Sequence, residues 1–167
     1  MWNGSEPVAR VTHRVRLIGC GNPDAGDDAV GLVALARLRA KVPEGVDVVE
    51  AGPATRVLDL LDDADTVIVI DAVHAQMGER PGGTLVRAEA GPDGLPAELR
   101  GALSSHGLGL AEAVGLAAAL GRSPSVVFHG VEVSDVTIGA PLSPAVADAL
   151  PRLTDAVLVD VRTAVTS

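Results

Sequence analysis

Apolar residues follow two alternating patterns along this chain: short continuous runs, and longer segments in which they recur every three or four positions. The continuous runs are rich in valine and isoleucine, and they predict buried strands near residues 15–20, 46–50, 66–70 and 125–131. The segments with helical spacing predict helices near residues 28–41, 55–62, 107–120 and 143–165.

This alternation of strands and helices predicts an α/β fold, a three-layer sandwich with a mostly parallel, twisted sheet and helices on both faces. The segment Thr84–Arg87 alternates polar and apolar residues after two glycines, which predicts an antiparallel edge strand. Ser143 and Pro144 are expected at the N-cap and first position of the last helix. Pro151 is expected to kink or divide that helix.

The composition provides enough hydrophobic residues for a large core but few aromatic residues that could stack against nucleic-acid bases. Of the 167 residues 47% are hydrophobic, with one Trp, one Phe and no Tyr. We expect residues 15–167 to form a single α/β domain, preceded by an N-terminal extension over residues 1–14. A net charge of −9 repels phosphate backbones, so nucleic acid is excluded as a partner.

Cys20 is the only cysteine, so neither an internal disulfide nor a cysteine-based zinc cluster is predicted, and Cys20 is expected in the core. The N-terminal segment lacks a continuous apolar stretch, and no later stretch reaches the ~20 apolar residues that a membrane span needs. The sequence therefore predicts a soluble cytoplasmic protein without a membrane partner.

The turn after the first predicted strand is rich in glycine and aspartate. Gly19 and Gly21 begin a dinucleotide-binding pattern, but Asp24 stands where the third glycine belongs. Asp27 and Asp28 follow where phosphate oxygens would approach, so a cation suits this turn better than a phosphate. Helix capping is the alternative role for either aspartate, and one of them can cap while the other faces a cleft.

Ligands of such sheets bind beyond the carboxyl ends of the strands, and three candidate residues follow from that rule. Asp28 follows the first strand, Asp71 ends the strand near 66–70, and His106 precedes the helix near 107–120. Two carboxylates and an imidazole suit a divalent metal or a metal-bearing substrate. The alternative role for Asp71 is to cap the segment that follows it. The alternative for His106 is that of a capping or hydrogen-bonded loop histidine.

The other histidines and acidic residues that draw notice are not assigned to the site. His74 is expected to be a solvated loop histidine, although its position three residues after Asp71 leaves membership of the site open. His129 is expected in the core or at the end of a strand. Glu132 and Asp135 stay without a role. Three aspartates form an acidic cluster that is expected to be a solvated end of a helix: Asp62, Asp63 and Asp65.

Several short motifs in order identify a family resemblance that runs from about Val15 to Val161. They are Ile18-Gly19-Cys20-Gly21-Asn22, Gly26-Asp27-Asp28-Ala29-Val30-Gly31, Ile70-Asp71-Ala72, Pro81-Gly82-Gly83-Thr84, Ser105-His106-Gly107-Leu108-Gly109-Leu110 and Gly130-Val131-Glu132. With these motifs the chain resembles the hydrogenase maturation endopeptidases, which remove a C-terminal extension from the large subunit of nickel–iron hydrogenases. The sequence departs from that family at Ala51-Gly52-Pro53, where relatives often carry Gly-Gly-Thr.

The resemblance implies that Asp28, Asp71 and His106 are both the metal-binding and the catalytic residues. It also implies that the nickel belongs to the large-subunit precursor, the expected partner, and that the enzyme recognises this nickel after insertion. Another divalent metal in the isolated protein is compatible with the resemblance. The attacking water is activated either by a metal acting as a Lewis acid or by a free carboxylate acting as general base.

Two other functions stay open at this point. The first is a metallochaperone or assembly checkpoint of the same fold that binds the nickel-loaded precursor without cleaving it. The second is a peptidase of the same fold that acts on a different proprotein. The sequence lacks a H-E-x-x-H helix and a G-x-S-x-G turn, which argues against conventional zinc-protease and serine mechanisms.

Overall fold

The computed structural model describes residues 13–52, 57–74, 80–100, 110–122 and 124–167, and their strands form one five-stranded sheet in the order β2-β1-β3-β5-β4. Four of the strands run parallel, namely β1 (Val15–Cys20), β2 (Asp47–Ala51), β3 (Thr66–His74) and β5 (Ser125–Val133). At the edge, β4 (Leu85–Glu89) pairs antiparallel with β5, which confirms the predicted antiparallel edge strand.

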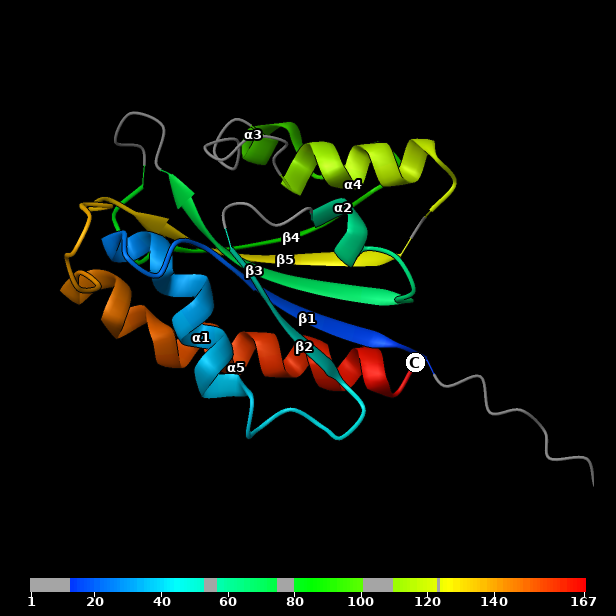
Figure 1. The fold of residues 1–167 in the computed structure, drawn as a ribbon, viewed down its shortest axis with the longest axis horizontal. Helices are drawn as coiled ribbons and strands as arrows, with labels where there is room; N and C mark the ends of the chain where they lie inside the picture. Colours follow the sequence, from blue (N-terminus) through cyan, green and yellow to red (C-terminus); the bar gives the residue numbers. More distant parts are fainter. Residues whose placement is uncertain (1–12, 53–56, 75–79, 101–109, 123) are drawn as a thin grey trace, which may run out of the picture.

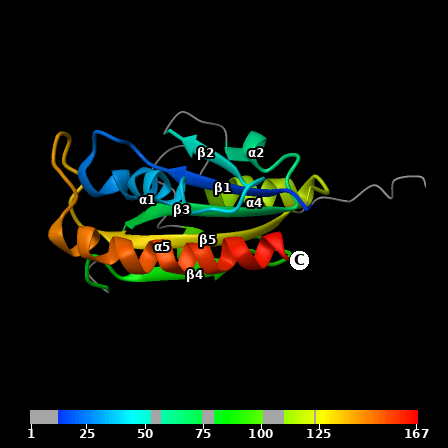
Figure 2. The ribbon, with the colours of Figure 1, turned by 90° about the horizontal axis from the view of Figure 1, so that it is seen from below.

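Helices cover both faces of this sheet (Figure 1). The helices α1 (Val30–Leu38) and α5 (Pro144–Val165) lie on one face. The short helices α2 (Val57–Leu60) and α3 (Ala97–Arg100) lie with α4 (Leu110–Ala119) on the other. Seen from below, α5 runs along the sheet beside β5 (Figure 2). The predicted three-layer α/β sandwich is therefore confirmed.

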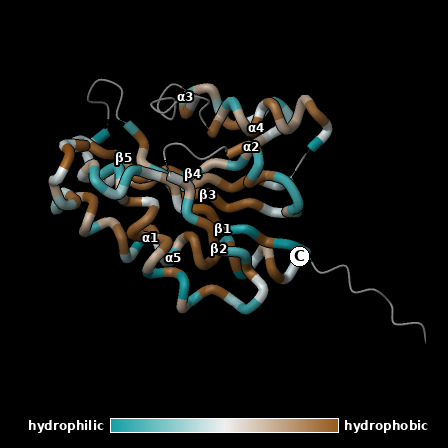
Figure 3. Tube along the Cα trace, in the orientation of Figure 1, coloured by the Kyte–Doolittle hydropathy of each residue, from teal (hydrophilic) through white to brown (hydrophobic). Residues whose placement is uncertain are grey.

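The alternation of side chains along the strands divides the core into two layers. On β3, Ile68 and Ile70 pack with the helices α1 and α5, whereas Val67 and Val69 pack with residues of α4. All four are completely buried. Figure 3 shows the same distribution as hydrophobic strands at the centre of the molecule. A sheet buried on both faces explains why its strands appear in the sequence as continuous apolar runs.

Some element boundaries differ from those predicted. The strand β3 continues through His74 because it pairs with β5 along its whole length, from Thr66 to His74. The predicted helix near 28–41 consists of a 3₁₀ turn over Gly26–Ala29 followed by α1, which ends at Leu38. The short helix α3 was not predicted. Of the predicted helix near 107–120, residues 107–109 lie outside the described residues.

The last helix extends without interruption from Pro144 to Val165, and the expected division at Pro151 does not occur. Its buried residues include Val146, Leu150, Leu153 and Val157, which form one apolar stripe on both sides of the proline. Packing of this stripe against the sheet offsets the backbone hydrogen bond that Pro151 cannot donate. Within the described residues, no helix is long and apolar enough to cross a lipid bilayer.

Candidate active site

The strand order reverses between β1 and β3, because the chain moves from β1 to β2 on one side and then to β3 on the other. Open parallel sheets bind ligands at such a reversal, beyond the carboxyl ends of the strands. Asp28 follows β1, and Asp71 lies in the carboxyl-terminal half of β3, so the fold brings these two predicted residues to one edge. His106 lies outside the described residues.

Asp28 is held by the glycine turn that follows β1. Gly21 has a φ of 141°, and a Cβ atom there would overlap the carbonyl oxygen of Asp28, so only glycine allows this close approach. The backbone N–H of Asn22 donates a hydrogen bond of 3.2 Å to Oδ2 of Asp28. With only 3% of its surface exposed, the Asp28 carboxylate is fixed by the turn at the edge of the sheet.

The neighbouring Asp27 has a different role. Its Oδ1 accepts a hydrogen bond of 2.6 Å from the backbone N–H of Ser143, and its Oδ2 accepts one of 2.9 Å from the Ser143 hydroxyl. Ser143 occupies the predicted N-cap of α5, yet its hydroxyl bonds to Asp27 and makes no capping bond. Asp27 therefore ties the turn after β1 to the start of α5, while Asp28 lies at the candidate site.

Asp71 lies in an environment that opposes its ionisation. Burial, reinforced by the negative charge of Asp28, raises the pKa of Asp71 to about 7, against the lowering effects of the Ala72 backbone N–H and of His74. The N–H of Ala72 lies 2.8 Å from Oδ1 of Asp71. A cation between two such carboxylates relieves both their desolvation and their repulsion, so Asp28 and Asp71 fit a metal-bearing ligand.

Asp28 and Asp71 by themselves do not make up the predicted metal-binding trio. Within the described part of the chain, no group of three or more histidine, cysteine, aspartate or glutamate side chains is arranged to hold a metal ion. The third predicted residue, His106, is not among those residues, so the complete trio stays a prediction.

His74 also reaches this edge, because β3 extends four residues beyond its predicted end at Ile70. Its Nε2 atom lies 3.6 Å from Oδ1 of Asp28. The interaction with Asp28 raises the pKa of His74 against the effect of burial, and the charges of Asp71 and Glu132 act in the same direction. The sequence signal was the apolar run that continues past Asp71 through Ala72 and Val73, which favours a longer strand.

Cys20 confirms its prediction as a buried residue, with 7% of its surface exposed. Burial raises the pKa of its thiol well above the usual value, and the charges of Asp71 and Asp28 raise it further. Since the thiolate is the nucleophilic form of cysteine, this environment argues against a cysteine-peptidase mechanism at Cys20.

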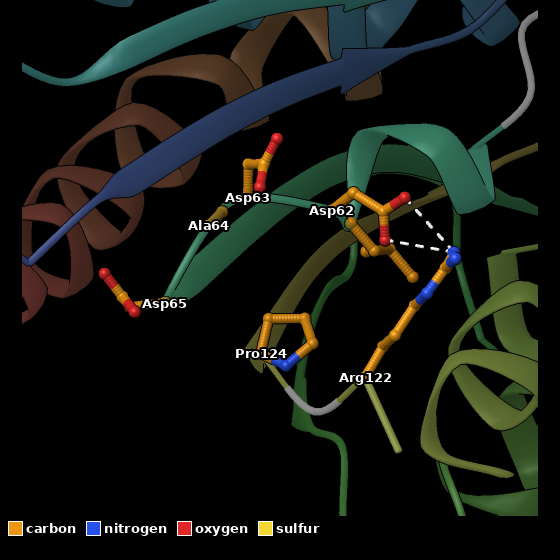
Figure 4. A pocket seen from close by; sticks show the side chains of 7 residues that line it. Asp62, Asp63, Ala64, Asp65, Arg122 and Pro124 are labelled. Carbon is orange, nitrogen blue, oxygen red and sulfur yellow. Dashed lines mark hydrogen bonds and ion pairs between the residues drawn. The ribbon is translucent and has the colours of Figure 1, made fainter. Parts of the chain in front are cut away.

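A separate cavity lies at the opposite, amino-terminal end of the strands, next to the acidic cluster Asp62, Asp63 and Asp65. Figure 4 shows the Asp62 carboxylate facing Arg122, with an ion pair of 3.1 Å between them. The backbone N–H of Arg14 donates a hydrogen bond of 2.6 Å to Asp65. Asp63 and Asp65 are exposed and Asp62 is half-buried, which agrees with the predicted solvated end of a helix, while Asp62 and Asp65 each also have a protein partner. The cavity is distant in the fold from Asp28.

Comparisons with known proteins find the same fold. The chain is similar in structure to the hydrogenase maturating endopeptidase HybD from E. coli, with a TM-score of 0.75, 23% identity, and coverage of 90% of this chain and 93% of that one. It is also similar to the [NiFe] hydrogenase maturation protease HycI from Thermococcus kodakarensis, with a TM-score of 0.68, 25% identity, and coverage of 92% and 95%. No curated protein sequence matches significantly.

A family model described as HycI, hydrogenase maturation protease, matches residues 30–160, which is well over half of the chain. The matched segment contains Asp71 and begins two positions after Asp28. This match shows that the chain belongs to the hydrogenase maturation proteases and is a peptidase.

Proposed function

We propose that this peptidase removes the C-terminal extension from the large-subunit precursor of a nickel–iron hydrogenase once nickel has been inserted. The nickel is part of the substrate, and Asp28, Asp71 and His106 are the residues that reach its open coordination positions. In this proposal the enzyme distinguishes the loaded precursor from the empty one, because its three residues have a metal ion to bind only when the substrate supplies it.

The observation that carries the proposal is the pairing of Asp28 with Asp71 at the reversal of strand order. The two carboxylates come from different elements and repel one another strongly enough to contribute to the raised pKa of Asp71. Such an arrangement costs stability in the free protein, and a cation brought by the substrate offsets that cost. A site of this kind favours a metal-loaded precursor over an empty one.

Two routes to hydrolysis are compatible with these residues. In the first, the substrate's nickel supplies Lewis acidity near the scissile carbonyl, and the carboxylates orient the substrate. In the second, the carboxylate of Asp71 accepts a proton from the attacking water. Both routes require Asp28 and Asp71 to keep their positions, and neither uses Cys20.

Incubating the protein with a cognate large-subunit precursor, with and without nickel, tests the proposal by mass spectrometry. The expected result is loss of a C-terminal peptide from the nickel-loaded precursor alone. Cleavage of both forms contradicts the nickel-dependent recognition and favours a peptidase for another proprotein. Binding of the loaded precursor without cleavage favours a checkpoint protein that does not cut.

A further inference from the structure

Glu132 is a buried carboxylate at the same edge of the sheet, and one of its two oxygens lacks a hydrogen-bond partner within the described residues. Only 3% of its surface is exposed. Its Oε1 atom lies 3.5 Å from Nε of Arg80, a side chain that is itself half-exposed. Within the described residues, its Oε2 atom is the buried side-chain atom that lacks any hydrogen-bond partner. Native proteins pair nearly all such groups, so an orphaned carboxylate oxygen beside a candidate active site requires an explanation.

The pairing of β3 with β5 places Glu132 on the site's side of the sheet. Asp71 is opposite Gly130, and Val73 is opposite Glu132. Because side chains alternate along a strand and paired residues of parallel strands share a face, Glu132 projects from the same face as Asp71, one pleat further toward the carboxyl edge. His74 is close enough for its charge to affect the pKa of Glu132, which burial raises above its usual value.

The backbone around Glu132 is fixed by the Pro81-Gly82-Gly83-Thr84 turn. The N–H of Gly83 donates to the Glu132 carbonyl at 2.8 Å, and the N–H of Glu132 donates to the Thr84 carbonyl at 2.9 Å. Gly83 has a φ of 82°, and a Cβ atom there would overlap the carbonyl oxygen of Ala145, so this turn requires glycine. The turn therefore fixes the backbone of Glu132, and its side chain is buried, so the orphaned oxygen is not the end of a surface side chain.

When Glu132 is ionised, the missing partner of Oε2 is a hydrogen-bond donor, because a carboxylate only accepts. Charged donors bind carboxylates most strongly, and the edge already concentrates the carboxylates of Asp28, Asp71 and Glu132. We propose that Glu132 is a specificity-determining residue that binds a basic side chain of the precursor beside the scissile segment. This inference rests on the proposed function, since the precursor is the ligand that supplies the side chain.

Steady-state cleavage of the nickel-loaded precursor by the wild type and by Glu132→Gln tests this docking role. The substitution keeps the shape of the side chain and removes its charge. We expect KM to rise ~10- to 100-fold, which corresponds to the loss of one charged hydrogen bond, while kcat stays within about threefold of the wild-type value. Glu89→Gln on β4 is the matched control, because Glu89 is exposed and pairs with Arg87 away from the site. That control is expected to leave KM unchanged.

Precursor variants identify the partner. Each Arg, Lys and His near the cleaved bond is replaced singly by Gln, and one replacement is expected to raise KM for the wild type but not further for Glu132→Gln. An unchanged KM for Glu132→Gln, or an increase that no basic residue shares, overturns the docking role. Glu132→Asp, which keeps the charge on a shorter side chain, is expected to give an intermediate KM and serves if Glu132→Gln does not fold. If the wild type cleaves no precursor, the proposed function itself fails.

Discussion

Two histidine–aspartate pairs in this molecule differ in the groups that surround them. His129 of β5 and Asp160 of α5 lie 2.6 Å apart, and Arg87 of β4 donates two further hydrogen bonds to Asp160 at 2.8 and 2.9 Å. In contrast, Nε2 of His74 lies 3.6 Å from Asp28. Beside that second pair lie Asp71, with a pKa of about 7, and Glu132, with an orphaned oxygen.

The difference distinguishes a structural network from the candidate active site. Asp160 has its pKa lowered chiefly by the Arg87 hydrogen bonds and further by His129, so its charge is stabilised within the fold. Asp71 and Glu132 instead have raised pKa values, chiefly because burial opposes their charges. A folded protein retains such unfavourable groups where a ligand completes them. The histidine–aspartate motif alone therefore does not single out the candidate site, whereas the raised pKa of Asp71 and the orphaned oxygen of Glu132 do.

The largest expected effect comes from removing the charges of the candidate active site. Asp28→Asn and Asp71→Asn are each expected to lower precursor processing by at least ~100-fold, because each removes a charge required in both proposed routes. His106→Ala is expected to do the same if His106 completes the trio. Processing is measured by the mass of the precursor, and folding by circular dichroism. Asp155→Asn, an exposed position on α5, is the control and is expected to process normally. Normal processing by two of the three variants shows that the trio is wrong.

Changes in the network of His129, Asp160 and Arg87 are expected to lower the stability of the protein and to leave precursor processing unchanged. Asp160→Ala leaves buried His129 without its acceptor and removes one of the two acidic partners of Arg87, at a cost of about 2 kcal/mol in the free energy of unfolding. Urea denaturation at pH 7 measures this loss, with Asp155→Asn again as control. Processing per folded molecule is expected to stay at the wild-type level. A processing defect as large as that of Asp71→Asn removes the distinction between the two regions.

The same contrast explains how much the sequence could predict. The parallel sheet, its antiparallel edge and the convergence of Asp28 with Asp71 follow from periodicity and from the chain direction of the strands, which are local signals. Which of the adjacent aspartates faces the site depends on Ser143, more than a hundred residues away. The orphaned oxygen of Glu132 depends on the pairing of β3 with β5, which no local pattern encodes, whereas the apolar run through Ala72 and Val73 is a local signal for the longer strand that carries His74.

A smaller effect is expected in the pH dependence of stability. The pKa of Asp71 is raised from 3.8 to about 7 in the folded state, so the folded protein binds this proton more tightly than the unfolded chain does. This group therefore makes wild-type stability fall as the pH rises from about 4 to 7. Asp71→Asn lacks that loss and is expected to be more stable than the wild type by at least about 1 kcal/mol at pH 8, with a smaller gain at pH 5. Thermal or urea unfolding at the two pH values measures the difference, and an equal gain at both contradicts the assignment.

The smallest effect is expected for the His74–Asp28 pair, because 32% of the His74 side chain is exposed and the two atoms lie 3.6 Å apart. The pKa of His74 is raised in the folded state, mainly by Asp28, so its contribution to stability is present below pH 6.5 and is lost as the pH rises through the folded value. His74→Asn is expected to cost less than about 1 kcal/mol at pH 6 and almost nothing at pH 9. Urea unfolding at both pH values measures this, with Asp28→Asn as the partner variant, since its effect and that of His74→Asn are expected to be less than additive at pH 6 only. Fully additive effects at pH 6 mean that the pair is not coupled, and His74 then contributes to the site only through its neighbours Asp71 and Glu132.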